Sequence, residues 1–430
     1  MQFRLNGEMR LIAATVLGAA VLVSPAHAED IVLKMWTLDN NGYKEFIAEA
    51  AEAFKATHPN VTIEHQIFPG DPYKTALKVA LVGSDGPDVF FNWSGDKAKQ
   101  LVKDKLALDI TDLGTAPGGF ATVLPEGWLD AFRYDGRLYG AAIDAVSKYV
   151  FYDKAYFAEH NVVIPKTLGE LGNLCKAIRK TDPDTIPMPL GNKTRWTAIH
   201  WMTMLNERAM GVAGTAADYD LTRPADQLYT DPGYAKAFQA LVDLQDAGCF
   251  EDAPNATEYA IADSMFATRA SPMEYCGTWC TSGLDAAGFT DYGFFRLPVM
   301  DGGKGSADAN FLVPEGYQVS AKTAHPKEAV EWLSFLVSDQ QGLKFAEKVQ
   351  FLPSNTKLID QAEGVSQSFK DIARDVGTLK QGVNVLDALL EATVADAYMN
   401  ATVEVLNRTL TPEQAVTKIR DAAVAVQAKQ

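Results

Sequence analysis

The sequence predicts an α/β protein built from two domains. Short apolar strands alternate with amphipathic helices between residues 31 and 93, an order typical of βαβ units with a parallel sheet. An order of strand, helix, break and second helix follows much later, over residues 316–353. The chain has 430 residues, too many for one hydrophobic core and enough for two domains.

Residues 1–28 have the features of a cleaved secretory signal. Arg4 and Arg10 form a basic start, residues 11–23 an apolar run, and residues 26–28 a small-x-small cleavage site. The run is too short to span a bilayer as a stable helix. We expect an exported mature chain that starts at Glu29, with no lipid anchor because no cysteine follows the cleavage site, and a soluble one because no later run reaches about 18 apolar residues.

The spacing of apolar residues predicts the secondary structure at the start of the mature chain. Strands are predicted at residues 31–36, 61–68 and 88–93, and helices at residues 43–57 and 73–82. Ligands of parallel sheets collect beyond the carboxyl ends of the strands. The loops at residues 36–40 and 92–96 are therefore candidate site loops, and their candidate residues are Trp36, Asp39, Asn40, Asn92, Trp93 and Asp96. The alternative for the two tryptophans is an ordinary core aromatic, and for Asn40 and Asp96 a turn or a helix cap.

Later helices carry start and stop signals. Thr167 followed by Glu170 predicts a capping box, and Gly248 ends a predicted helix over residues 234–247. In the late unit a strand, Tyr317 to Ser320, precedes a helix that has Pro326 just inside its start. The tail has helices from about residues 367 and 387.

Four cysteines follow the export signal: Cys175, Cys249, Cys276 and Cys280. Cys175 lies at an apolar position of a helical run, which predicts a small buried hydrophobe. Three residues separate Cys276 from Cys280, so the two form neither a redox pair nor a zinc knuckle. We expect one disulfide that uses Cys276 or Cys280, and the pairing stays open.

The charge balance excludes one class of partner. The formal net charge is −16, from 39 basic and 55 acidic side chains. Such a protein repels phosphate backbones, so we expect no nucleic acid partner.

Several segments, in order, resemble a known family. Residues 137–144 and 149–154, the strand ending in Gly277 and Trp279, and the late unit 316–353 are together similar to the extracellular solute-binding proteins, family 1, of sugar ABC transporters, the maltose-binding type. Ala142 and Asp153 depart from that family's usual Pro and Asn. The departures threaten no part of the fold.

The resemblance implies a two-lobe periplasmic binding protein fold, with each lobe a mostly parallel sheet flanked by helices and a hinge crossed several times. It assigns residues 29–142 and 309–350 to an N-terminal lobe, and residues 143–308 and 351–430 to a C-terminal lobe. Residues 1–28 are the signal peptide.

It also implies contacts to a ligand between the lobes. Trp279 is the foremost candidate, since it closes the family's Gly-x-Trp strand. Asp144 is expected at the cleft mouth as a hydroxyl acceptor, although a surface Asp is the alternative. Trp196 is expected to stack on the ligand, with Lys193 and Arg195 as hydroxyl donors or, alternatively, parts of a solvated loop. Tyr317 completes the set.

We therefore expect a periplasmic sugar-binding protein that works as a monomer and delivers an oligosaccharide or polyol to a membrane permease. Sugar rings stack on Trp, and their hydroxyls need charged or amide partners. Glycerol phosphate or another polar solute is the alternative ligand, and a secreted glycoside-active enzyme the alternative class. The chain has no nucleophile elbow, Walker-type phosphate loop or His-Glu-x-x-His helix, so we predict no catalytic residue, metal or cofactor.

Overall fold

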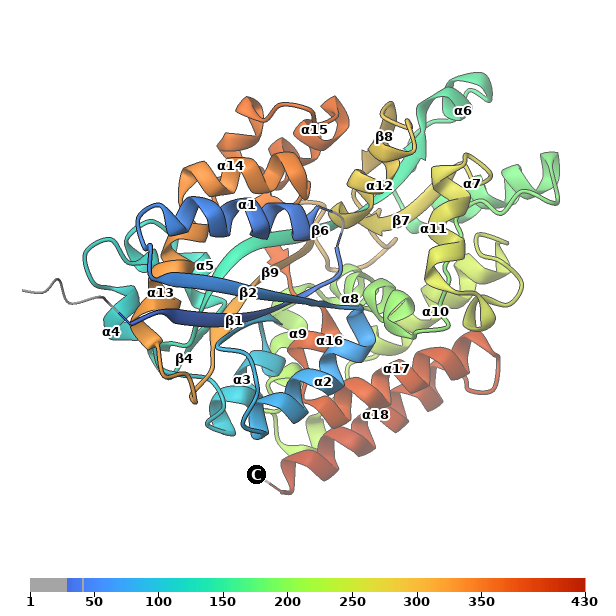
Figure 1. The fold of residues 1–430 in the computed structure, drawn as a ribbon. Helices are drawn as coiled ribbons and strands as arrows, with labels where there is room; N and C mark the ends of the chain where they lie inside the picture. Colours follow the sequence, from blue (N-terminus) through green and yellow to red (C-terminus); the bar gives the residue numbers. More distant parts are fainter. Residues whose placement is uncertain (1–28, 41, 430) are drawn as a thin grey trace, which may run out of the picture.

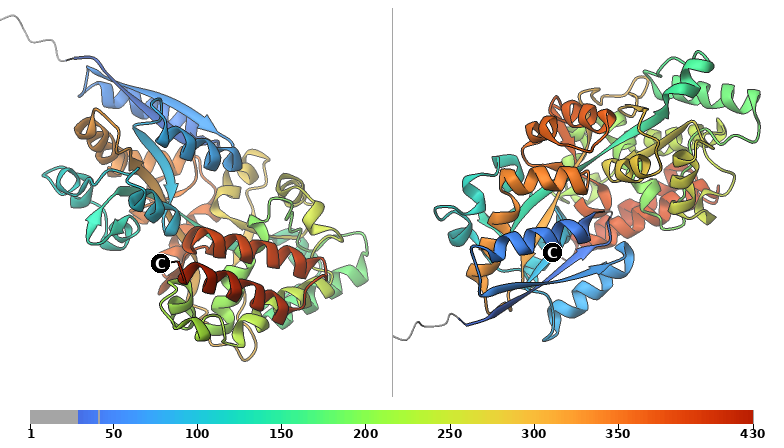
Figure 2. Two further views of the ribbon diagram at one scale, coloured as in Figure 1. Left: turned by 90° about the horizontal axis from the view of Figure 1, so that it is seen from below. Right: turned by 45° about the horizontal axis from the view of Figure 1, so that its top comes forward.

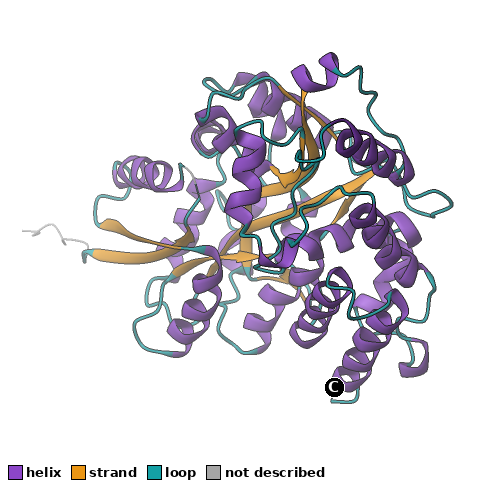
Figure 3. Ribbon diagram, turned by 90° about the vertical axis from the view of Figure 1, so that its right-hand side faces the viewer, coloured by secondary structure: helices purple, strands orange, loops and turns teal. Residues whose placement is uncertain are grey.

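The computed structural model describes residues 29–40 and 42–429, so the predicted signal segment lies outside the described residues. Strands run through the interior and helices lie outside them (Figure 3). Within the described ranges no helix combines the length and the apolar composition needed to cross a membrane.

One sheet is built from both ends of the chain. Its order is β10-β6-β9-β3-β1-β2, with β1 (Ile31–Leu38), β2 (Val61–Phe68), β3 (Val89–Trp93), β6 (Gly140–Asp153), β9 (Ala309–Val319) and β10 (Leu352–Pro353). β1 pairs in parallel with β2 and β3, which confirms the predicted βαβ start. The late strand β9 lies between β3 and β6 and is antiparallel to both, so the late chain returns to the first sheet.

Strand β6 joins this sheet to a second group of strands. Residues 140–147 pair with β9, and residues 148–153 pair with β7 (Met273–Gly277) and β8 (Tyr292–Phe295). All three of these pairings are antiparallel. Parallel pairing, which was expected of each lobe, occurs among β1, β2 and β3 and between β11 (Gln381–Val383) and β9. A separate hairpin pairs β4 (Arg133–Tyr134) with β5 (Arg137–Leu138).

Helices near the first sheet bury apolar stripes against it. In α1 (Tyr43–Lys55) residues Tyr43, Phe46, Ile47, Ala50 and Phe54 recur at helical spacing and are buried. The late helices α13 (Pro326–Leu336) and α14 (Asp339–Lys348) contact α1 (Figure 1). The remaining helices of this part are α2 (Gly70–Val82), α3 (Asp96–Lys103), α4 (Thr111–Gly114), η1 (Phe120–Thr122) and α5 (Glu126–Asp130).

The second half of the molecule packs around α8 (Trp196–Met210), which is buried along most of its length. It contacts α10 (Gly233–Asp246), α16 (Leu386–Leu389) and α17 (Ala392–Leu406). Figure 2 shows α17 beside α18 (Pro412–Gln427) as a red pair. The other elements are α6 (Lys154–Glu159), α7 (Leu168–Thr181), α9 (Val212–Tyr219), η2 (Ala225–Gln227), η3 (Pro254–Ala256), α11 (Tyr259–Ala267), η4 (Thr278–Cys280), α12 (Thr281–Ala286), η5 (Thr356–Gln361) and α15 (Gln367–Val376).

The four cysteines form two disulfides, Cys175–Cys249 and Cys276–Cys280. Cys175 is fully buried, as predicted, but the expectation of one disulfide was wrong, because Cys175 is bonded as well. Packing of α7 on α10 brings Cys249, the residue after Gly248, to a Cα–Cα distance of 5.0 Å from Cys175. This approach depends on tertiary packing, which helical periodicity does not report.

The predicted capping box at α7 is half formed. Thr167 Oγ1 accepts a hydrogen bond from the Glu170 backbone N–H, but the Glu170 carboxylate accepts from Lys166 N–H instead of Thr167 N–H. A full capping box occurs at Thr411 and Gln414, at the start of α18.

Candidate ligand-binding site

A cavity of about 530 Å³ opens between the end of β3 and the start of α8. One wall comes from α2, β3 and α3, and the other from the segment before α8 and from α16 and α17. The first wall contains Asn92, Trp93 and Lys97, and the second contains Trp196 and Asp387. A hollow of about 590 Å³ beside α7 and the end of α10 contains no tryptophan, so it lacks the stacking surface predicted for the site.

Trp93 lies at the carboxyl end of β3 and is half-buried. Its ring packs edge-on against Phe91, with centroids 5.0 Å apart. Two ammonium groups lie near the ring, Lys97 Nζ at 4.8 Å and Lys74 Nζ at 5.4 Å from the centroid. The first wall therefore offers an aromatic ring with cations beside it.

An ionic cluster connects the two walls. Lys97 Nζ lies 3.0 Å from Asp387 Oδ2, and His200 Nε2 lies 3.7 Å from Asp387 Oδ1. Burial alone would raise the pKa of Asp387, but Lys97 and His200 outweigh it and hold that pKa well below its usual range. Burial lowers the pKa of His200 to about 4, so the imidazole is neutral at pH 7.

Trp196 is the aromatic residue of the opposite wall. Its ring lies 4.7 Å from the Tyr259 ring, 5.1 Å from the His200 ring and 6.2 Å from the Trp279 ring. Arg195 precedes it in the left-handed conformation, with φ 63°, and its guanidinium donates to Asp396 and Asn400 on α17. This pairing orients the chain at the start of α8.

Lys148 is a buried cation inside the same aromatic cluster. The residue is 2% exposed, and its Nζ lies 4.4 Å from the Tyr275 centroid, 5.6 Å from Trp279 and 5.9 Å from Trp196. Burial lowers the pKa of Lys148 to about 7, although the Glu274 charge acts in the opposite direction. The Lys148 amine thus lies among three aromatic rings, with its charged form disfavoured by burial.

Five of the predicted site residues line the cavity: Asn92, Trp93, Asp96, Arg195 and Trp196. Asn92 Nδ2 donates to Gln318 Oε1 at 2.8 Å. Asp96 accepts from Gln100, and burial raises the pKa of its carboxyl group. Trp279 packs edge-on against Trp196 and is not a lining residue of the cavity.

The other predicted residues lie elsewhere. Trp36 packs on Phe68 at 4.5 Å, while Asp39 is exposed and Asn40 half-buried in the loop after β1. Lys193 is exposed and pairs with Glu258.

Asp144 is 1% exposed, because the pairing of β6 with β9 buries it, so it is not the surface residue of the alternative interpretation. Tyr43 Oη donates to its Oδ2 at 3.1 Å. Tyr317 is buried on β9, opposite Ala141.

Sequence reasoning missed Lys97, Lys148, His200, Tyr259 and Asp387. Lys97 had a local signal, because it follows Asp96 in a predicted site loop. His200 also had one, since it is one helical turn after Trp196. Asp387 had none, as it reaches Lys97 from 290 residues away.

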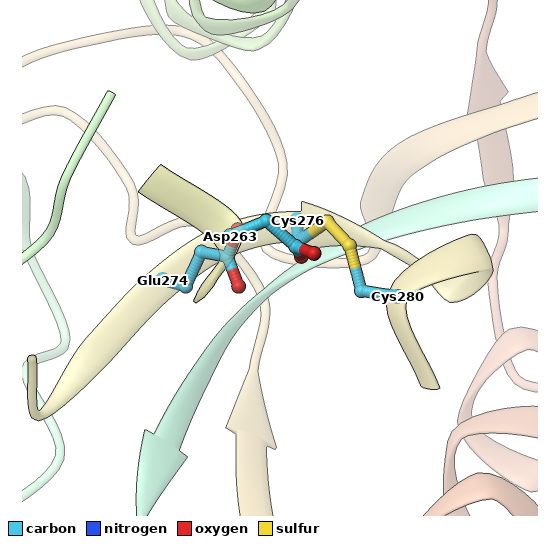
Figure 4. Close-up of side chains that lie close together, drawn as sticks. All are labelled: Asp263, Glu274, Cys276 and Cys280. Carbon is cyan, nitrogen blue, oxygen red and sulfur yellow. A yellow bond between two sulfur atoms is a disulfide. The ribbon is translucent and has the colours of Figure 1, made fainter. Parts of the chain in front are cut away.

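Asp263, Glu274, Cys276 and Cys280 are close enough for their ligand atoms to lie within 4.8 Å of one another (Figure 4). The disulfide occupies both sulfurs, and thiolates are the form of cysteine that metals bind. Burial raises the pKa of Asp263 to about 6 and that of Glu274 well above its usual range. In the disulfide form the cluster offers two carboxyl groups with raised pKa values and no thiolate.

A profile of the bacterial extracellular solute-binding proteins matches residues 49–371. The chain belongs to this family. The resemblance predicted from its motifs is thus confirmed, and the family consists of binding proteins and not of enzymes, as expected.

Similar proteins share most of their length with this chain. An ABC transporter extracellular-binding protein of Pyrococcus horikoshii is 26% identical over 349 residues, 79% of this chain and 76% of its own. The diacetylchitobiose-binding protein DasA of Streptomyces coelicolor is 25% identical over 340 residues, 77% and 75% of the two chains. A chitin oligosaccharide binding protein of known structure is 21% identical and has a TM-score of 0.80 over 92% of this chain and 99% of its own. This last likeness confirms the two-lobe α/β fold.

Proposed function

We propose that this solute-binding protein binds a neutral oligosaccharide or a polyol in the cavity between Trp93 and Trp196. The observation that carries the proposal is that the two tryptophans stand on opposite walls of one cavity. Apolar sugar faces stack on such rings, and hydroxyl groups bond to charged and amide partners in fixed directions. The cavity volume falls in the range of about 300–1,000 Å³ typical of small-molecule sites.

The charges of the cavity favour a neutral ligand over a phosphate. Lys97 is paired with Asp387, and Arg195 with Asp396. A phosphate needs a cluster of cations in excess. The lining has as many carboxylates as cations (Asp96, Asp104, Asp387 and Asp396; Lys74, Lys78, Lys97 and Arg195), a balance that suits hydroxyl groups, which both donate and accept. Diacetylchitobiose and chitin oligosaccharide binding by the similar proteins agrees with this choice.

We further propose that the lobes are residues 29–142 with 309–350 and residues 143–308 with 351–430, and that ligand favours their closure. The continuous strand β6, which pairs in both groups of strands, supports a hinge. The mature chain would work in the periplasm as a monomer, after cleavage at residue 28, and deliver its ligand to the permease of an ABC importer. Membership of the extracellular solute-binding family supports this role.

The test is calorimetric titration of residues 29–430 with neutral oligosaccharides, polyols and glycerol phosphates. We expect binding of one neutral class and a loss of roughly tenfold or more in affinity for Trp93→Ala and for Trp196→Ala, since buried aromatic anchors dominate recognition. Trp128→Ala is the matched control, because Trp128 is half-buried on α5 and does not line the cavity. Binding of glycerol phosphate alone, or equal losses in all three variants, contradicts the proposal.

A further inference from the structure

The Cys276–Cys280 disulfide closes the short turn that carries Trp279. Tyr259, the first residue of α11, places its hydroxyl 3.4 Å from Cys276 Sγ and 3.2 Å from Cys280 Sγ. The same hydroxyl accepts a hydrogen bond from Trp279 Nε1 at 2.9 Å. The Tyr259 hydroxyl is therefore in direct contact with both the disulfide and the Trp279 indole.

The Tyr259 and Trp279 rings also pack against Trp196. Tyr259 and Trp279 lie 4.7 Å and 6.2 Å from Trp196, centroid to centroid, and Trp196 is the ring that lines the cavity. Trp279 folds back over Gly277, where an added Cβ would come within 2.0 Å of the indole. The absence of a side chain at Gly277 thus leaves the space that the indole occupies.

The two disulfides differ in what they constrain. Cys175 and Cys249 are 74 residues apart, whereas Cys276 and Cys280 are 4 apart. The loss of unfolded-chain entropy that a disulfide causes grows with the logarithm of the loop length. The short loop therefore contributes less to overall stability, and its main effect is on local geometry.

We propose that the Cys276–Cys280 disulfide and Tyr259 are positioning elements of the ligand site, which hold Trp279 and through it Trp196 in the binding orientation. Cys175–Cys249 serves the fold alone. The inference rests on the proposed function, because it assigns the ligand to the Trp196 wall.

The first measurement needs no ligand. The indole N–H resonance of Trp279 is identified in a ¹H–¹⁵N spectrum by its disappearance in Trp279→Phe. We expect it to shift, and its proton to exchange faster, in Tyr259→Phe and in Cys276→Ser/Cys280→Ser. Tyr292→Phe is the control, since this buried tyrosine belongs to the same cluster but its hydroxyl bonds Ser366. Cys175→Ser/Cys249→Ser is a second control if it folds. An unchanged indole in both test variants overturns the proposal.

The second measurement is affinity for the neutral sugar found by calorimetry. Tyr259→Phe and the Cys276/Cys280 double variant should bind roughly fivefold more weakly, the effect of one lost hydrogen bond, with nearly unchanged melting temperatures. In a Trp279→Phe background Tyr259→Phe should cause no further loss. Wild-type affinity in both test variants, or an equal loss in the Trp279→Phe background, overturns the positioning role. Failure of the wild type to bind any sugar contradicts the proposed function, and the indole resonance then decides the inference alone.

Discussion

Two carboxyl groups face each other where β6 pairs with β9. Asp144 and Glu315 are partners in the ladder, and both are buried. Burial raises the pKa of Asp144 to about 8, with the Tyr43 hydrogen bond acting against it, and raises that of Glu315 well above its usual range. At neutral pH the pair therefore holds protons that exposed carboxyl groups would have lost.

This predicts a pH dependence that Asp144→Asn should reduce. A carboxyl group whose pKa is about 4 in the unfolded chain and about 8 in the folded one binds its proton more tightly in the folded state. Its contribution to stability is complete below pH 4 and declines as the pH rises toward 8, by at most about 1.4 kcal/mol per pH unit. Urea unfolding at pH 5, 6, 7 and 8 should show a smaller decline for Asp144→Asn than for the wild type.

The amide that Asp144→Asn introduces is neutral at every pH and can still accept from Tyr43, which is why this variant is chosen. Asp252→Asn is the control, since Asp252 is exposed, and it should leave the decline unchanged. Equal slopes for the wild type and both variants would show that Asp144 does not hold its proton in the folded protein.

At the scale of elements, α3 and α16 are held together by the Lys97–Asp387 ion pair. The two side chains are 27% and 10% exposed, and α16 also contacts α8. The pair therefore ties the wall that carries Trp93 to the wall that carries Trp196. A buried charge that loses its partner is strongly destabilising.

Lys97→Met should lower the free energy of unfolding by roughly 2–3 kcal/mol, less than for a fully buried pair because Lys97 reaches the cavity. The control is Lys154→Met, whose ion pair with Asp291 has side chains 45% and 81% exposed, and which should cost no more than about 1 kcal/mol. Urea unfolding of both variants measures these losses of stability. Equal losses would mean that the ion pair between α3 and α16 stabilises the protein no more than an exposed surface ion pair does.

Individual helices and strands were also the features that the sequence predicted best. The strands at residues 31–38, 61–68 and 89–93 and the helix that starts at Pro326 follow from short-range periodicity and end signals. Asn92, Trp93 and Asp96, which line the cavity, were predicted as site candidates for a similar reason, because the end of a strand is a local feature. Contacts such as Lys97–Asp387 and Cys175–Cys249 join residues far apart in sequence, and no local pattern encodes them.

At the scale of the whole molecule, the two groups of strands are connected by β6. Its pairing with β9 shifts register between Ala142 and Asp144, a bulge that bends a strand. A bend in a strand shared by both groups is a suitable place for a hinge. Ligand that contacts both walls would then draw the lobes together.

X-ray scattering of residues 29–430 tests this closure. A compact monomer of this length has a radius of gyration of about 21 Å, and saturation with the bound sugar should decrease the measured radius. Trp196→Ala, at the same sugar concentration, should show a smaller decrease. An unchanged radius in the wild type at saturation would mean that binding leaves the lobes in place, and a mass twice that of the chain would contradict a monomer.

The connectivity of the disulfides bears on how the chain would be oxidised during the export proposed above. The cysteines are bonded in consecutive pairs along the chain, the first to the second and the third to the fourth, Cys175 to Cys249 and Cys276 to Cys280, so the two loops neither overlap nor interlock. If cysteines are joined in the order in which they cross the membrane, every bond formed is the native one. Thiol–disulfide reshuffling, which can take hours without an isomerase, is then not needed, and both bonds can close before the last 150 residues arrive.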